Sequence, residues 1–124
     1  MPAEPAAPAQ QGRALVVDDE MLICMLVESI LMDAGYAVVT ANSVAEALAT
    51  IDADRIDFAV VDVNLKGQSA YPIAEKLASA RIPFVFATGA GHGPMEFPDR
   101  PWIAKPFNET DLLDVIGRLT DPAS

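Results

Sequence analysis

The sequence has few cysteines, few basic residues and no long apolar run, and each scarcity excludes a class of protein. Cys24 is the single cysteine among 124 residues, so a disulfide framework is excluded and the ligands of a zinc site are missing. Its place within a helical pattern favours a buried structural thiol. No run approaches the roughly 20 apolar residues of a membrane span, and the first residues show neither the basic nor the apolar region that is typical of a signal peptide. We therefore expect a cytoplasmic protein without membrane contacts.

Basic side chains are outnumbered by acids. Eight lysines and arginines stand against 18 aspartates and glutamates, which gives a formal net charge of −10. Nucleic acid is not expected as a partner, because its binding draws on clustered basic side chains. Hydrophobic residues make up 52% of the chain, enough for one compact domain. We expect a disordered Pro/Ala-rich leader over residues 1–12 and a single folded domain over residues 13–121.

Apolar runs alternate with segments of helical spacing along the expected domain. Continuous apolar runs predict five strands, over residues 13–18, 36–40, 57–62, 82–88 and 102–104. Apolar residues three and four apart predict four helices, over residues 20–34, 43–52, 69–80 and from Asn108 onward. The segment 89–101 holds three glycines and three prolines, which predicts an irregular fourth crossover or one with only a short helical turn. This alternation predicts an α/β fold whose parallel sheet is covered on both faces.

Local signals mark several helix ends. Gly35 stands where a left-handed residue ends the first helix, Ser43 and Glu46 form a capping box for the second, and Asn108 caps the last. In the first helix the apolar residues at helical spacing include Leu26. These signals support the element boundaries given above.

Polar side chains stand at the carboxyl ends of four of the five expected strands. Asp18 and Asp19 follow the first strand, Asp62 ends the third, Thr88 ends the fourth and Lys105 follows the fifth. Singly, each has a structural interpretation as a helix-terminal acid, a strand-end hydroxyl or a surface lysine. Ligands of open α/β sheets bind outside the carboxyl ends of parallel strands, so together these residues predict one site.

The chemistry of such a site can be argued from its groups. A carboxylate can accept a phosphoryl group and form an acyl phosphate. Neighbouring acids repel one another and also repel an anionic phosphoryl group. Mg²⁺ prefers hard oxygen ligands and bridges carboxylates to phosphoryl oxygens, so Mg²⁺ is the expected cofactor. A metal and one lysine suffice for a transfer that depends on positioning and charge neutralisation.

These residues, in this order and on these elements, resemble a response regulator receiver domain over essentially everything after the leader. The resemblance implies a flavodoxin-like, doubly wound, five-stranded parallel sheet of order 2-1-3-4-5, with the fourth helix short or missing. It implies that Asp62 is the phosphoacceptor. Asp18, Asp19 and Asp62 then hold Mg²⁺, together with the backbone carbonyl of Asn64. The protein itself is then a phosphoacceptor in signalling rather than an enzyme, one that assists its own phosphorylation and dephosphorylation.

The resemblance also implies a switch. Thr88 and Lys105 bind the phosphoryl oxygens, and movement of the Thr88 hydroxyl vacates space for an aromatic side chain three residues before the lysine. Trp102 occupies that position in this chain. The alternative is that Trp102 is an edge aromatic with no switching role.

A shorter motif resembles one subgroup of receivers. Phe86–Gly89 matches the Phe-Ala-Thr-Gly of the FATGUY receivers, while Ala90 and Gly91 stand where that motif has a hydrophobic residue and a tyrosine. The likeness implies an altered fourth helix, no output domain, and phosphoryl donors that are sensor histidine kinases of the HWE or HisKA2 kind, or a phosphotransfer protein.

The expected function is therefore a stand-alone response regulator of a two-component phosphorelay, with a downstream protein partner or a role as phosphoryl shuttle or sink. One alternative is a small phosphatase with Asp62 as a transient nucleophile, although Asn64 stands where haloacid dehalogenase-type enzymes have a second aspartate. Another is an unphosphorylated scaffold. His92, the single histidine, is interpreted as exposed and incidental, against a phosphorelay or metal role.

Overall fold

The computed structural model describes residues 12–65, 67–89, 100–105 and 107–120. The strands of the main sheet are β1 (Arg13–Val17), β2 (Ala37–Ala41), β3 (Phe58–Asp62), β6 (Phe84–Thr88) and β7 (Trp102–Ala104). The helices of the described residues are α1 (Met21–Asp33), α2 (Val44–Ala53), α3 (Tyr71–Ser79) and α4 (Glu109–Thr120). A small antiparallel hairpin joins β4 (Asn64–Leu65) to β5 (Gln68–Ser69).

The five long strands form one parallel sheet of order β2-β1-β3-β6-β7. Because β6 and β7 are the fourth and fifth strands of this sheet, the expected order 2-1-3-4-5 and the α/β fold class are confirmed. The expectations for residues 90–99 of the fourth crossover, His92 included, lie outside the described residues. None of the helices in the described ranges is long and apolar enough to cross a membrane.

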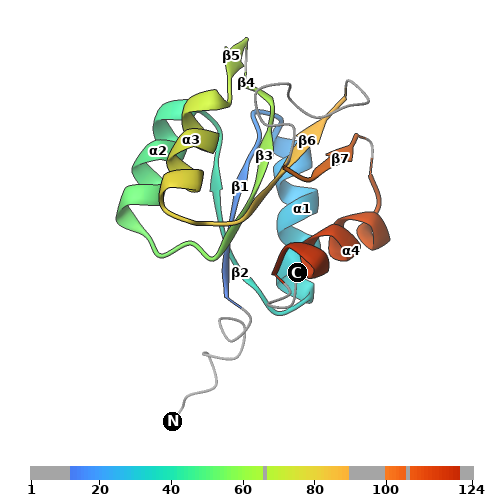
Figure 1. The fold of residues 1–124 in the computed structure, drawn as a ribbon. Coiled ribbons are helices and arrows are strands. Elements are labelled where there is room, and N and C mark those ends of the chain that lie inside the picture. Colours follow the sequence, from blue (N-terminus) through green and yellow to red (C-terminus); the bar gives the residue numbers. More distant parts are fainter. Residues whose placement is uncertain (1–11, 66, 90–99, 106, 121–124) are drawn as a thin grey trace.

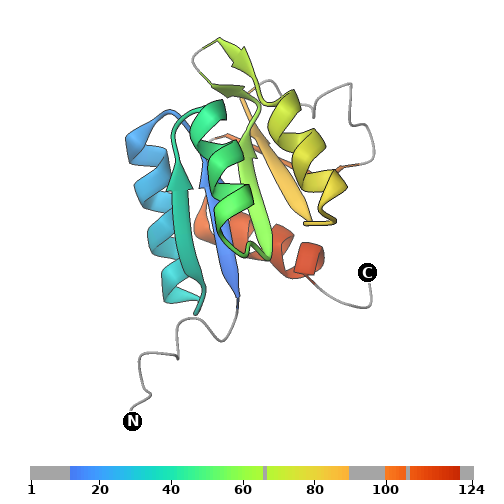
Figure 2. The ribbon, with the colours of Figure 1, turned by 90° about the vertical axis from the view of Figure 1, so that its left-hand side faces the viewer.

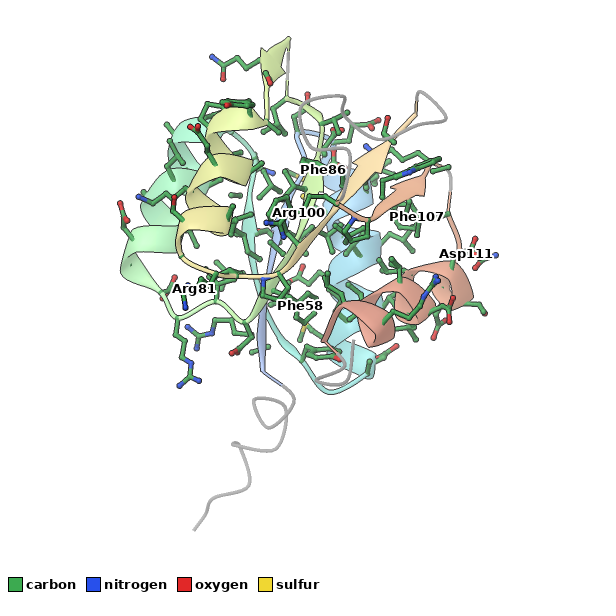
Figure 3. All side chains as sticks on the ribbon, in the orientation of Figure 1. Phe58, Arg81, Phe86, Arg100, Phe107 and Asp111 are labelled. Atoms are coloured by element: carbon green, nitrogen blue, oxygen red, sulfur yellow. The ribbon has the colours of Figure 1, made fainter. Side chains whose placement is uncertain are left out.

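The sheet separates two hydrophobic cores. Helices α2 and α3 cover one face and α1 and α4 the other, as Figures 1 and 2 show from two directions. Phe86 is buried in the core beneath α2 and α3, whereas Phe58 is buried in the core beneath α1 and α4 (Figure 3). Continuous apolar runs thus serve strands that are buried on both faces, as β3 and β6 are along their full length.

Local chemistry sets most of the helix ends. Gly35 has a φ of +101°, which glycine adopts without steric cost, and the turn it makes lets Tyr36 donate its backbone N–H to the Leu31 carbonyl. The Ser43 hydroxyl accepts the backbone N–H of Glu46, and the Asn108 side chain accepts that of Asp111. These three predicted helix ends are confirmed.

Two details differ from the sequence-based expectations. Leu26 is exposed on α1, because the helix turns its stripe of Cys24, Val27, Ile30 and Leu31 toward the sheet. The segment expected to be a plain loop after β3 contains the β4–β5 hairpin, with Gly67 at φ +83° in its turn.

Candidate phosphoryl and metal site

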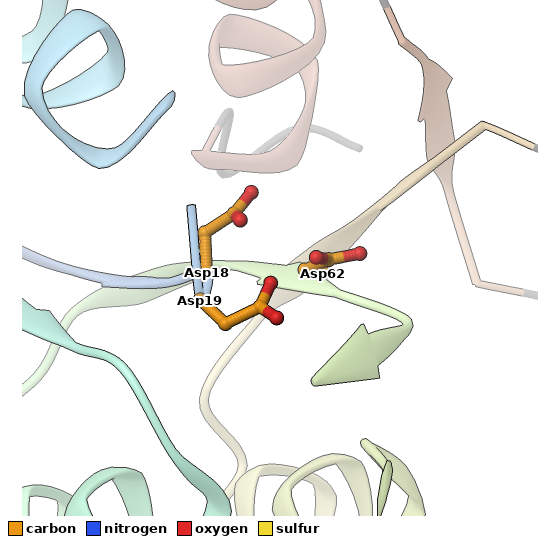
Figure 4. A group of neighbouring side chains, drawn as sticks. All are labelled: Asp18, Asp19 and Asp62. Atoms are coloured by element: carbon orange, nitrogen blue, oxygen red, sulfur yellow. The ribbon is translucent and has the colours of Figure 1, made fainter. Parts of the chain in front are cut away.

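Three carboxylates meet at the carboxyl ends of β1 and β3. These strands are neighbours with Val17 opposite Val61, so Asp18 and Asp19 emerge beside Asp62. One carboxylate oxygen of each aspartate lies within 4.8 Å of those of the other two, and Figure 4 shows the three side chains around a common space. We call these three residues the acid cluster. Asp18 and Asp62 are buried, so their mutual repulsion is poorly screened by water.

Lys105 places its ammonium against the acid cluster. Its Nζ atom lies 2.9 Å from Asp18 Oδ2 and 3.3 Å from Asp62 Oδ2, and 3.7 Å from Oε1 of Glu20. Burial on its own lowers the pKa of Lys105, but the hydrogen bond with Asp18 and the negative charges of Asp62 and Asp18 outweigh it, so the pKa is raised. The lysine is therefore a fixed positive charge inside the site.

The remaining predicted residues lie around this centre. Thr88 is buried at the end of β6, and its backbone carbonyl accepts the Lys105 N–H at 2.8 Å. Asn64 begins β4, two residues beyond Asp62, and pairs with Ser69 of β5. Trp102 begins β7, pairs with Phe86 and is 41% exposed. The structure thus unites the acid cluster with Lys105, ties Thr88 to Lys105 through the backbone, and leaves Trp102 at the far end of the short edge strand.

Sequence reasoning missed a set of donors behind Asp18. The Asn42 side-chain amide and the Cys24 thiol both donate to the Asp18 backbone carbonyl, at 3.1 Å and 3.2 Å. The Glu20 backbone N–H donates to Asp18 Oδ1 at 2.9 Å. Asn42 stands immediately before the Ser43 cap, and this place in the sequence was the signal from which its contact with Asp18 could have been predicted.

Cys24 is the buried thiol that the sequence predicts. It is 4% exposed in the α1 face that packs on the sheet. Burial, and next the negative charge of Asp18, raise its pKa to about 11. The thiol therefore stays protonated and acts as a hydrogen-bond donor rather than as a nucleophile.

The donor set of the acid cluster fits Mg²⁺. Three carboxylates converge from two adjacent strand ends, and hard oxygen ligands of this kind are those that Mg²⁺ selects. Among the described residues, Lys105 is the one cation for which ion pairs with these acids are seen, and a divalent cation would neutralise the remaining negative charge.

A doubly wound parallel sheet with clustered acids and a lysine outside its carboxyl ends defines a class of protein that handles phosphoryl groups with a hard cation. The profile of the response regulator receiver domain family matches residues 14–117, and the chain belongs to that family. Receiver domains are signalling proteins of two-component systems. They typically bind Mg²⁺ through acidic residues, accept a phosphoryl group on an aspartate, and interact with histidine kinases or phosphotransfer proteins.

Comparison with solved structures gives the same fold. The chain is 40% identical to SdrG from Sphingomonas melonis Fr1, with a TM-score of 0.78 over 86% of this chain and 94% of that one. It is 29% identical to the chemotaxis response regulator CheY4 of Vibrio cholerae, with a TM-score of 0.77 over 86% of this chain and 97% of that one.

Curated relatives are longer. The regulatory protein VanR of Enterococcus faecium is 37% identical over 107 residues, which are 82% of this chain and 46% of VanR. The chain spans about half the length of the curated relatives it matches. Similarity to them therefore concerns the receiver portion.

Proposed function

We propose that this chain is a single-domain response regulator that accepts a phosphoryl group on Asp62 from a histidine kinase or a phosphotransfer protein. It then signals through altered protein contacts or passes the group on as a shuttle or sink. The observation that carries the proposal is the convergence of Asp18, Asp19, Asp62 and Lys105 at one sheet edge. The domain spans residues 13–121 after a leader over residues 1–12, in the cytoplasm.

The proposed reaction is an in-line transfer. A carboxylate oxygen of Asp62 bonds to phosphorus while the N–P bond of a donor phosphohistidine breaks, and the electron pair of that bond stays with the imidazole nitrogen, which takes a proton from solvent. Mg²⁺, held by Asp18, Asp19, Asp62 and the Asn64 backbone carbonyl, supplies charge neutralisation and orientation when bound. The protein thereby assists its own phosphorylation and dephosphorylation.

Lys105 and Thr88 act on the transferred group in this proposal. The Lys105 ammonium, now 3.3 Å from Asp62 Oδ2, is close enough to follow the new negative charge onto the phosphoryl oxygens. The Thr88 hydroxyl turns toward the same oxygens, and Trp102 moves into the space that it leaves. This motion biases an existing equilibrium between two conformations.

An exposed apolar face beside the site supports a protein donor. Met21, Leu22, Met25 and Leu26 lie on the outer side of the first two turns of α1, and Leu22 is 80% exposed. Helix α1 starts two residues after Asp19, and α1 contains no basic residue. This face suits the apolar side of a donor helix with a basic rim, which would bring its phosphohistidine to the acid cluster.

The proposal includes membership of the FATGUY subgroup, with kinases of the HWE or HisKA2 kind as donors. The Phe86–Gly89 motif supports this membership. A phosphatase that uses Asp62 as a transient nucleophile and an unphosphorylated scaffold are the alternatives that an experiment must separate.

The deciding experiment incubates the protein with Mg²⁺ and acetyl phosphate and follows intact mass. We expect one hydroxylamine-labile phosphoryl group, absent from Asp62→Asn and from a sample with EDTA. Asp57→Asn is the matched control, because Asp57 lies at the opposite end of the same sheet, and this variant should be labelled normally. Release of many equivalents of phosphate per protein would establish the phosphatase. The absence of both labelling and phosphate release would establish the scaffold.

The donor surface is tested with a phosphorylated kinase. Leu22→Asp should slow transfer from the kinase at least about tenfold by charging the apolar face, while labelling by acetyl phosphate should stay unchanged. Equal rates from the kinase would exclude this face as the docking surface.

A further inference from the structure

The backbone of Asp18 is held from two sides by side chains of two other elements. Asn42, at the junction of β2 and α2, donates its amide to the Asp18 carbonyl at 3.1 Å, and Cys24 of α1 donates its thiol to the same oxygen at 3.2 Å. The Asn42 Nδ2 atom also lies 3.8 Å from Cys24 Sγ. One carbonyl oxygen therefore accepts both available donors.

That carbonyl belongs to the peptide unit that joins Asp18 to Asp19. Because the peptide is planar, holding its oxygen restrains the ψ angle of Asp18 and the plane from which the φ angle of Asp19 is measured. These two angles set the directions of the two side chains relative to each other through the peptide plane that they share. Two of the three members of the acid cluster thus depend on the orientation of a single peptide plane.

Asn42 is itself anchored. Its backbone N–H donates to Glu46 Oε1 at 2.7 Å, and the Glu46 N–H donates to the Ser43 hydroxyl at 3.1 Å. The Asp18 N–H donates to the Ala41 carbonyl at 3.1 Å, so the residue before Asn42 also binds Asp18. The first turn of α2 is therefore connected through Asn42 to the acid cluster.

We propose that Asn42 and Cys24 are positioning residues that orient the Asp18–Asp19 peptide so that both carboxylates face a divalent cation. The inference rests on the proposed function, since it concerns the same acid cluster. Neither residue binds the cation. Both act through the Asp18 carbonyl, as outer partners of metal ligands do when they set ligand direction and affinity.

Titration calorimetry with MgCl₂ tests this on the full chain. Asn42→Ala should raise the dissociation constant for Mg²⁺ about tenfold, and Cys24→Ala should raise it severalfold. Cys24→Ser keeps a donor of similar size and should stay within about twofold of the wild type, which a loss of packing alone would not explain. Thr50→Ala is the control, because it removes a hydrogen bond of α2 to the Glu46 carbonyl without touching Asp18.

The outcomes separate the two proposals. If the wild type binds Mg²⁺ and is labelled at Asp62, but Asn42→Ala and Cys24→Ala bind Mg²⁺ within twofold of it, the positioning role is excluded and the proposed function stands. If the wild type is not labelled at Asp62, the proposed function is excluded, and the Mg²⁺ affinities of the variants then decide the positioning role by themselves. Asn42 is exposed, so its alanine variant decides the question even where a Cys24 variant does not fold.

Discussion

The two ends of the sheet treat charge differently. At the amino end, the Arg13 guanidinium lies 3.4 Å from Asp54, the Arg55 side chain lies 3.8 Å from Asp57, and Asp57 accepts the Arg13 backbone N–H at 2.7 Å. Two acids there face two arginines. These pairs are partly exposed, so each contributes little beyond the backbone hydrogen bond that fixes the start of β1.

At the carboxyl end the balance is broken. Asp18, Asp62 and Glu20 share the ammonium of Lys105, and Asp18 and Asp62 are buried. Such an excess of charge lowers the stability of the folded protein unless a ligand neutralises it. The difference teaches that the acids described at the amino end are paired with arginines, whereas the acids at the carboxyl end outnumber the cation that contacts them.

The largest effect is expected from removing the lysine. Lys105→Met leaves two buried carboxylates without their ammonium, and the free energy of unfolding should fall by about 3 kcal/mol at pH 7 in EDTA. Urea unfolding followed by circular dichroism measures this. Excess Mg²⁺ should reduce the deficit, because the metal supplies the missing positive charge.

The pH dependence of this loss of stability is a second test of the same prediction. Lys105 has a pKa above its ordinary value in the folded protein, so its stabilising contribution is complete below about pH 10.4 and is lost as the pH rises through the higher folded-state pKa. The difference between wild type and Lys105→Met should be constant near neutrality and, on the alkaline side, shrink only above that pH. A difference under about 1 kcal/mol at pH 7 would contradict the charge imbalance at this end.

A smaller effect concerns the thiol beside the acid cluster. With a pKa of about 11 instead of 9.0, Cys24 is about 1% thiolate at pH 9, so alkylation by iodoacetamide in EDTA should be about fifty-fold slower than in urea. Because the folded-state pKa is the higher one, the stability from the neutral thiol is complete below about pH 9 and is lost toward pH 11. Equal native and unfolded rates would show that Cys24 is accessible and that the charge of Asp18 does not reach it.

The smallest effects, of opposite sign, compare the two ends directly. Asp19→Asn removes repulsion within the acid cluster and should raise the free energy of unfolding by about 1 kcal/mol in EDTA, while weakening Mg²⁺ binding. Asp57→Asn removes a charged acceptor of the Arg13 N–H and should lower it by about 1 kcal/mol, with no change in Mg²⁺ affinity. Changes of the same sign in the free energies of unfolding of both variants would contradict the difference between the two ends of the sheet.

Much of the fold can be predicted from the sequence because strands that are buried on both faces consist of continuous apolar runs. Phe58–Asp62 and Phe84–Thr88 are such runs, and the polar residue at the end of each is the signal of a strand terminus. The β4–β5 hairpin escaped prediction because strands of two residues have no periodicity to detect. The exposure of Leu26 escaped it because several rotations of α1 bury an apolar stripe equally well by pattern alone.

The site was predictable to the extent that strand ends meet at one edge. That rule brings Asp18, Asp19, Asp62 and Lys105 together from distant parts of the chain. It says nothing of which groups orient the backbone behind them. The bonds from Asn42 and Cys24 to the Asp18 carbonyl depend on where a helix start and a helix face come to rest, which is a property of tertiary packing.

The hairpin between β3 and α3 has a practical consequence. Leu65 is buried in the core beneath α2 and α3, whereas Gln68 and Ser69 on the opposite strand are exposed, so one strand is anchored while its partner faces water. The segment begins two residues after Asp62. A fluorescent dye on a cysteine introduced at position 68 would therefore be attached to the segment that follows Asp62 without disturbing the interior. Its fluorescence would report the proposed phosphorylation of Asp62.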